Sequence, residues 1–247
     1  MADQDTPSQL KLDSEVVAEN AETTDTDQPE PTKPERYILA VPDSSLDLPD
    51  GSVVEVPPDF LQTVEDASYI ARGPAESDPS QRQLIPYCVA IRAGESPADA
   101  AVLTYRRPDG GESRLSQMRS VGFGGHIDPE DAEVDDDGKL DVVQTVLSAV
   151  SRELAEELGI SVGTDSLELI GVINDKSNDV GKVHLGLLYC FELPAGEKLS
   201  PEKKETADVQ LTPLPRLLEA MKADKDSWET WSQHGVPVLV DHLKDKA

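Results

Sequence analysis

The sequence predicts one α/β domain over residues 36–247, a fold in which a β-sheet and helices share a core. Two observations carry this prediction. Apolar runs of strand length recur on both sides of an amphipathic helical pattern that ends at Gly159, and further helical patterns follow residue 213. No internal repeat divides the chain, so we expect these elements to form one domain.

The amino-acid composition limits the classes of protein to which the chain can belong. The chain has 247 residues and a net charge of −27, which argues against nonspecific binding of nucleic acids and of anionic membranes but suits a protein that holds cations. No apolar run approaches the length of a membrane span, and the polar N-terminus is unlike a signal or transit peptide. Cys88 and Cys190 lie in apolar runs without metal-ligand spacing, so we expect two buried reduced thiols in a cytoplasmic protein.

The first 35 residues differ from the rest of the chain. Residues 1–35 are rich in Asp, Glu, Thr, Gln and Pro and poor in aromatic residues. A segment of this composition buries too little surface to offset its ordering entropy, so we expect an acidic, disordered tail with at most a short helix. Its charge favours solubility, and an interaction tail is the alternative.

The first ordered element is expected at residues 36–41, which have the pattern of a strand. Residues 57–67 are predicted to form a helix, and residues 72–83 a loop. Two further apolar runs, residues 84–91 and 101–106, are predicted to be strands that pair with each other.

Four arginines lie close together in sequence, from the end of the second of these strands onward. Arg106, Arg107, Arg114 and Arg119 precede the Gly124-Gly125 pair on an otherwise acidic chain. Because a guanidinium matches phosphate geometry, these arginines are candidates for binding substrate phosphates. The alternative is that they pair with the many carboxylates of the chain.

The amphipathic helix follows an acidic segment, residues 128–141. Its apolar residues are four, three, four and four positions apart, so they form one narrow stripe that faces a core. Gly159 then provides a helix stop. The residues of the stripe are Val143, Leu147, Val150, Leu154 and Leu158.

Three carboxylates crowd another face of this helix. Glu153, Glu156 and Glu157 are related by steps of three and four residues, and only Arg152 is near enough to offset their repulsion. A hard divalent cation such as Mg²⁺ or Mn²⁺ would relieve that repulsion. The alternative is an acidic surface helix in an acidic protein.

The rest of the chain predicts more strands and then helices. Residues 167–173 and 182–191 are predicted strands around a polar loop, and residues 208–211 a short last strand. His184, on the second of these strands, is a candidate for substrate binding, with a packed, hydrogen-bonded histidine as the alternative. Residues 213–222 are a predicted helix, and a capping-box pattern at residues 226–229 predicts the start of another, with Trp228 and Trp231 as core anchors.

Residues 152–160, with the sequence RELAEELGI, resemble the signature helix of the Nudix hydrolase family, G-x5-E-x7-R-E-U-x-E-E-x-G-U, where U is a bulky aliphatic residue. Every defined position of the second half is filled. In the first half, Gly125 resembles the loop glycine, but 18 residues separate it from Gln144, which stands where the motif has Glu. We interpret residues 128–141 as an insertion whose carboxylates are candidates to replace the missing one.

This resemblance implies the Nudix fold, a mixed β-sheet between helices, and hydrolysis of a phosphoanhydride, often in a nucleoside diphosphate linked to another group. It also implies Mg²⁺ as the cofactor, with Mn²⁺ as the alternative ion. Glu153, Glu156, Glu157 and the backbone carbonyl of Gly125 would be the metal ligands. One of the glutamates would double as general base, and Arg152 would orient the carboxylates.

Three other segments, residues 84–87, 121–127 and 171–175, are similar to a poorly characterised bacterial MutT-type group of predicted phosphoesterases. Markers of the ADP-ribose, coenzyme A and isopentenyl diphosphate subfamilies are missing. We therefore expect a small-molecule phosphoanhydride or nucleotide substrate of unspecified identity, and we leave a homodimer open. The alternative function is a Nudix-fold nucleotide-binding or sensor protein without hydrolysis.

Overall fold

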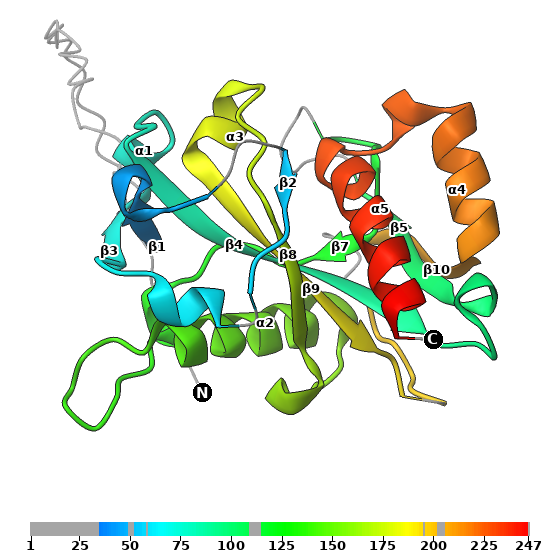
Figure 1. Cartoon of the computed structure of the whole chain (residues 1–247), viewed down its shortest axis with the longest axis horizontal. Helices are drawn as coiled ribbons and strands as arrows, with labels where there is room; N and C mark the ends of the chain where they lie inside the picture. Colours follow the sequence, from blue (N-terminus) through cyan, green and yellow to red (C-terminus); the bar gives the residue numbers. More distant parts are fainter. Residues whose placement is uncertain are drawn as a thin grey trace, which may run out of the picture. The chain divides into compact units, whose positions relative to one another are not determined.

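The computed structural model describes residues 35–48, 52–57, 59–108, 115–194, 196–201 and 206–246. Apart from Glu35, the tail predicted to be disordered lies outside these residues. The described residues form a mixed sheet with helices on both faces (Figure 1), which confirms the predicted fold class. None of the helices in this part of the chain has the length and apolar content needed to cross a lipid bilayer.

One mixed sheet organises the described residues. Its main path runs β10-β5-β4-β9-β8-β2; β4 and β9 pair in parallel, and the other pairs are antiparallel. The shorter strands β1, β3, β6 and β7 attach to one side of β4 and β5 or to each other. The strands are β1 (Tyr37–Pro42), β2 (Val53–Val54), β3 (Ser68–Ala71), β4 (Gln81–Arg92), β5 (Ala101–Arg106), β6 (Arg119–Ser120), β7 (Gly122–Phe123), β8 (Glu168–Ile173), β9 (His184–Glu192) and β10 (Ala207–Pro213).

Helices cover both faces of this sheet, and short 3-10 turns connect several of the elements. The α-helices are α1 (Arg72–Ala75), α2 (Val142–Leu158), α3 (Asp179–Val183), α4 (Leu214–Ala223) and α5 (Thr230–Asp245). The 3-10 turns are η1 (Asp43–Ser45), η2 (Phe60–Thr63), η3 (Pro97–Asp99), η4 (Pro129–Asp131), η5 (Thr164–Ser166) and η6 (Lys225–Ser227).

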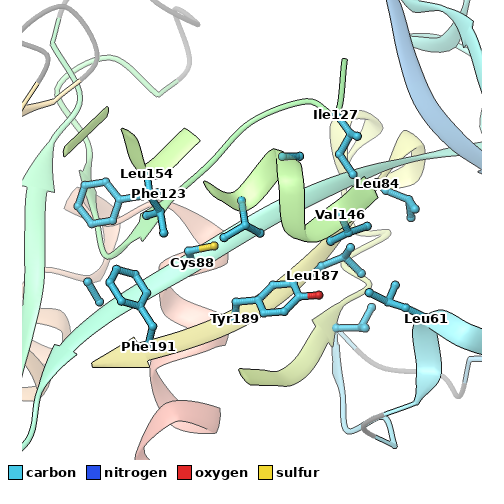
Figure 2. Close-up of a cluster of buried hydrophobic side chains, with 14 of the residues drawn as sticks. Leu61, Leu84, Cys88, Phe123, Ile127, Val146, Leu154, Leu187, Tyr189 and Phe191 are labelled. Atoms are coloured by element: carbon cyan, nitrogen blue, oxygen red, sulfur yellow. The ribbon is translucent and has the colours of Figure 1, made fainter. Parts of the chain in front are cut away.

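The central strands are buried on both faces. Leu84 and Cys88 of β4 join the core that contains α2, which Figure 2 shows, whereas Val89 and Ile91 join the opposite core with residues of α4 and α5. Side chains of a strand alternate between its two faces, so a strand covered on both sides is apolar at nearly every position. This explains why residues 84–91 form a continuous apolar run.

Helix α2 carries the signature motif and ends at Gly159, as its sequence predicts. The side chain of Asp141 accepts a hydrogen bond from the Gln144 backbone N–H, which caps the N-terminus. Gly159 ends the helix in the left-handed conformation, with φ of 69°. The buried face is wider than the predicted stripe, because Val146 and Ala149 are buried as well.

Strand β4 has a gap in its pairing that positions the glycine loop. On one side β4 pairs continuously with β9; on the other it pairs with β1 up to Gln83, with β7 from Cys88, and with β5 at its end. Gly124 occupies the space between, since a Cβ there would lie 2.1 Å from the carbonyl oxygen of Pro86. Its φ of 140° also favours glycine.

Two predicted helix starts differ from the structure. Residues 57–67 do not form a helix: only the 3-10 turn η2 is present, because Phe60 and Leu61 pack into the core and the chain then extends toward β3. The capping box predicted at residues 226–229 is also wrong. Trp228 pairs with Arg119 as an isolated β-bridge, so α5 starts at Thr230 and has no side-chain cap.

The two cysteines lie on neighbouring strands, Cys88 on β4 and Cys190 on β9, and both are buried and unbridged, as predicted. Burial raises the pKa of the Cys190 thiol to about 12 and that of Cys88 well above its usual range.

Candidate functional site

The signature glutamates of α2 meet the glycine loop, residues 124–128. Oε2 of Glu157 accepts a hydrogen bond from the backbone N–H of Gly124, with 3.0 Å between oxygen and nitrogen. The carboxylate of Glu153 lies against Gly125, because a Cβ on that glycine would be 2.7 Å from Glu153 Oε1. A side chain at position 125 would therefore occupy the space that the Glu153 carboxylate takes.

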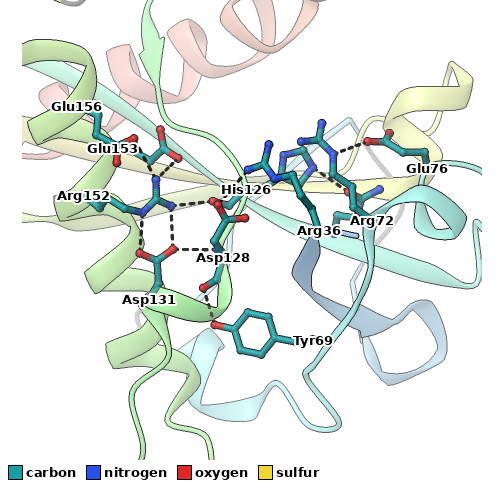
Figure 3. A network of polar contacts seen from close by, with 11 residues as sticks. Arg36, Tyr69, Arg72, Glu76, His126, Asp128, Asp131, Arg152, Glu153 and Glu156 are labelled. Atoms are coloured by element: carbon teal, nitrogen blue, oxygen red, sulfur yellow. Dashed lines mark hydrogen bonds and ion pairs between the residues drawn. The ribbon is translucent and has the colours of Figure 1, made fainter. Parts of the chain in front are cut away.

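Arg152 connects the helix to the loop and to the acidic segment (Figure 3). Its Nε and Nη2 donate to the two carboxylate oxygens of Asp131, each at 2.8 Å, and Nη2 also donates to the carbonyl of His126 at 3.0 Å. Its Nη1 lies 2.9 Å from Glu153 Oε1 and 3.3 Å from Glu156 Oε2. One guanidinium thus contacts three carboxylates, those of Asp131, Glu153 and Glu156.

Asp131 is a site residue that sequence reasoning placed inside an insertion. It stands six residues after Gly125, which is the G-x5-E spacing of the signature, with Asp in place of Glu. Its side chain is only 4% exposed and pairs with Arg152. The insertion relative to the signature therefore begins after Asp131 rather than at residue 128. The six-residue spacing from Gly125 is the sequence feature that could have identified Asp131. Gln144 is exposed near the start of α2.

The carboxylates of this site are crowded and partly buried. Burial raises the pKa of Glu153; Arg152 opposes this shift, and the charges of Glu156 and Asp131 add to it. The charges of Glu157 and Glu153 also contribute, after burial, to the raised pKa of Cys88. Like-charged oxygen donors that are poorly solvated fit a hard divalent cation, so these residues suit the metal that the resemblance implies.

The third glutamate is oriented differently. The side chain of Glu156 is 61% exposed, compared with 13% for Glu153, because it turns outward to Arg152. In the part of the chain that the structure describes, the donor atoms of the three glutamates are therefore not gathered within 4.8 Å of one another, whereas those of Glu76, His126 and His184 are.

A pocket of about 530 Å³ opens beside the glycine loop. Gly124 and Gly125 line it, together with polar side chains from the other side. Of the residues proposed to bind substrate, Arg107 and His184 line this pocket. Apolar side chains complete the wall: Ile85, Tyr87, Leu115, Met118 and Trp231.

The structure does not bring Arg106 or Arg119 to the pocket, and Arg114 lies outside the described residues. Arg106 donates two hydrogen bonds to Asp208, at 2.9 and 2.8 Å. Arg119 stacks over the ring of Trp228, with its guanidinium carbon 5.6 Å from the ring centroid. Arg106 thus pairs with a carboxylate, the structural role that the sequence analysis gave as the alternative, whereas Arg119 packs against an aromatic ring.

A buried carboxylate that the sequence did not reveal holds Arg107 in place. Glu229 is 3% exposed and accepts a hydrogen bond from the Tyr87 hydroxyl at 2.5 Å and from Arg107 Nε at 2.8 Å. Ser120 and Ser232 also donate to it. No sequence signal identifies these partners, because they come from strands and a helix that are far apart along the chain.

Two histidines face each other in the pocket wall, with ring centroids 5.6 Å apart. Nε2 of His126 is 2.8 Å from the side-chain oxygen of Gln83, and Nδ1 of His184 is 2.9 Å from the carbonyl of Val180. Burial, with a smaller contribution from the charge of Arg72, lowers the pKa of His126 to about 3. His126 is therefore neutral at physiological pH.

Comparison with known proteins agrees with this geometry. No family model matches the chain. The chain is 36% identical over 171 residues to Protein YmaB of Bacillus subtilis (strain 168), an alignment that covers 68% of this chain and 76% of that protein. The crystal structure of Tm1382, a Nudix protein, aligns with a TM-score of 0.61 and 26% identity, covering 83% of this chain and 98% of Tm1382.

The mixed sheet between helices, with a glycine loop against a glutamate-rich helix, defines a Nudix fold. The chain belongs to the Nudix hydrolase family.

Proposed function

We propose that this protein hydrolyses a phosphoanhydride bond in a nucleoside diphosphate linked to another group. The observation that carries the proposal is that Glu153 and Glu157 contact the same Gly124-Gly125 loop that lines the pocket. Carboxylates next to such a loop can hold a divalent cation where a substrate pyrophosphate would bind.

Glu153, Glu156 and Glu157, with the backbone carbonyl of Gly125, would hold Mg²⁺, and Mn²⁺ is the alternative ion. When bound, such a cation supplies charge neutralisation of the pyrophosphate and activation of the attacking water. Glu156 already lies at the solvent-exposed edge of the group, so it can turn toward an incoming ion without disturbing the core.

Two residues of the signature helix would orient the carboxylates and accept a proton from water. Arg152 keeps the carboxylates of Glu153 and Glu156 in fixed directions, and its pair with Asp131 ties the helix to the loop. Glu153, whose pKa is raised by burial, is a candidate for the general base that accepts a proton from water.

The lining of the pocket suits a substrate with an anionic part and a flat apolar part. Arg72 and Arg107 supply guanidinium groups for phosphate oxygens. Glu229 accepts a hydrogen bond from Nε of Arg107, and the Nη1 and Nη2 atoms of Arg107 remain donors for a phosphate. Tyr87 and Trp231 supply aromatic surface against which a planar group can pack.

The experiment is a measurement of phosphate and nucleotide release from a panel of nucleoside diphosphate derivatives, with and without Mg²⁺. We expect Mg²⁺-dependent release by the wild type and a loss of about 100-fold or more in Glu153→Gln, since removing one group that acts in the transition state commonly costs that much. Glu219→Gln, an exposed change on α4, is the matched control and should keep full activity. Saturable binding of a nucleotide without any release by the wild type would favour the sensor alternative instead.

A further inference from the structure

Three potential metal ligands from separate parts of the chain converge beside the pocket, and two of them, His126 and His184, line it. Glu76 follows α1, His126 belongs to the glycine loop, and His184 is the first residue of β9. One donor atom from each lies within 4.8 Å of the other two. Figure 3 shows Glu76 on the opposite side of His126 from the Asp131–Arg152 pair. This group is distinct from the signature glutamates, although His126 is next to Gly125.

The hydrogen bonds of the two imidazoles are a second, independent observation. Each ring has one nitrogen bonded to an oxygen that can only accept: Gln83 Oε1 for His126 Nε2, and the Val180 carbonyl for His184 Nδ1. With the side-chain oxygen of Gln83 directed at His126, those nitrogens carry the protons, and the lone pairs are on His126 Nδ1 and His184 Nε2. Metal-binding histidines commonly have this arrangement, because the outer bond fixes the tautomer and the ring direction.

The fold makes this arrangement rigid. The parallel pairing of β4 and β9 places Gln83 directly beside His184, so one pair of strands positions both a histidine and the partner of the other histidine. Gln83 is fully buried and His184 is 8% exposed. Glu76 is exposed, so it is the ligand through which an ion could enter.

We propose that Glu76, His126 and His184 form a second metal site, for a transition-metal ion such as Zn²⁺ rather than for Mg²⁺. Two imidazole nitrogens and one carboxylate suit Zn²⁺, whereas Mg²⁺ prefers oxygen ligands alone. Three protein ligands leave a position open, as in catalytic rather than structural zinc sites. Because His126 and His184 line the pocket, that position faces the space where a substrate phosphate would bind. This site goes beyond the proposed hydrolysis and does not depend on it.

A neighbouring arginine shapes the properties of the site. Nε of Arg72 donates a hydrogen bond to Oε1 of Glu76 at 3.0 Å, so Glu76 would bind the ion through Oε2. The guanidinium charge opposes a nearby cation, so we expect weaker binding than at a closed structural zinc site.

The test is calorimetric titration of Zn²⁺ into the full chain in excess Mg²⁺, which occupies oxygen-only sites. We expect one saturable Zn²⁺ site in the wild type and weakening of about tenfold or more in Glu76→Gln and in His184→Gln. Gln83→Leu, which removes only the outer hydrogen bond of His126, should weaken binding by about 10–100-fold. His242→Gln, a histidine on α5 outside this pocket, is the matched control and should bind as the wild type does.

Co²⁺ provides a second readout, because imidazole ligands in a four- or five-coordinate site give visible absorption bands that oxygen-only octahedral sites lack. We expect these bands in the wild type and in His242→Gln but not in His184→Gln. Glu76 is exposed, so Glu76→Gln tests the site even if a buried histidine variant fails to fold. Equal Zn²⁺ affinity in the wild type and Glu76→Gln, or a loss confined to Glu153→Gln, would overturn the proposal.

Discussion

At the scale of single residues, Arg152 determines the geometry of the candidate active site. It contacts the carboxylates of Asp131, Glu153 and Glu156 and the carbonyl of His126. A guanidinium presents five N–H donors in a fixed plane, so one side chain can orient several carboxylates together. A lysine would neutralise the same charge without fixing those directions, so an arginine is better suited than a lysine to orient these carboxylates.

The residues that could be predicted from the sequence are those whose identity and spacing are local. Glu153 and Glu157 belong to one helical motif, and their place beside the glycine loop followed from it. Glu229 could not be predicted, because its partner Tyr87 is 142 residues away and only the folded sheet brings them together. Gln83 is a similar case, since its contact with His126 depends on where the glycine loop crosses β4.

The cysteines give a prediction at this scale. Because burial raises the pKa of Cys190 from 9.0 to about 12, its thiolate fraction near neutral pH is about a thousandfold lower than that of an exposed cysteine. We expect a thiol reagent to label neither Cys88 nor Cys190 in the native protein and to label two thiols in the denatured, unreduced protein. Rapid labelling of the native protein, or no labelling after denaturation, would contradict this.

At the scale of elements, apolar runs with a clear period predicted the strands and α2 well. Residues 84–91 and 101–106 are strands because both faces of the sheet there are buried. Residues 57–67 and 226–229 were mispredicted because local helix signals gave way to distant contacts: Phe60 packs into the core beside α2, and Trp228 pairs with β6. Such contacts outweigh helix propensity and capping, which contribute only about 1 kcal/mol each.

The link between η4 and α2 can be tested with Asp131→Asn. This change removes the negative partner of Arg152 and keeps the size of the side chain, so we expect a loss of about 1–3 kcal/mol in the free energy of unfolding. The measurement is urea denaturation of the metal-free protein. Asp136→Asn, an exposed change in the same acidic segment, is the control and should have little effect. Equal stability of both variants would show that the Asp131–Arg152 pair does not hold the loop to the helix.

At the scale of the whole molecule, the sheet separates two cores. One edge of β4 is left unpaired between β1 and β7, and the proposed hydrolysis would take place there. The core with α2 supports the glutamates, and the opposite core supports α5, which starts directly after Glu229, the residue that holds Arg107 in the pocket. The glycine loop fills the gap in β4 and joins the two sides. With a net charge of −27, the protein concentrates carboxylates that repel one another, so a bound cation should stabilise the fold as well as support catalysis.

The most direct test of the account is titration of Mg²⁺ into the wild type, Glu156→Gln and Glu157→Gln, followed by calorimetry and by thermal unfolding. Binding to the folded state alone adds RT ln(1 + [Mg²⁺]/Kd), about 2.7 kcal/mol at 100 times Kd. We predict a saturable rise in the thermal midpoint of the wild type and of the control Glu219→Gln. Both signature variants should bind Mg²⁺ more weakly, with a metal-free midpoint that is unchanged or higher because repulsion is relieved. No saturable shift in the wild type, or the same shift in all four proteins, would contradict the claim that these glutamates form a metal site.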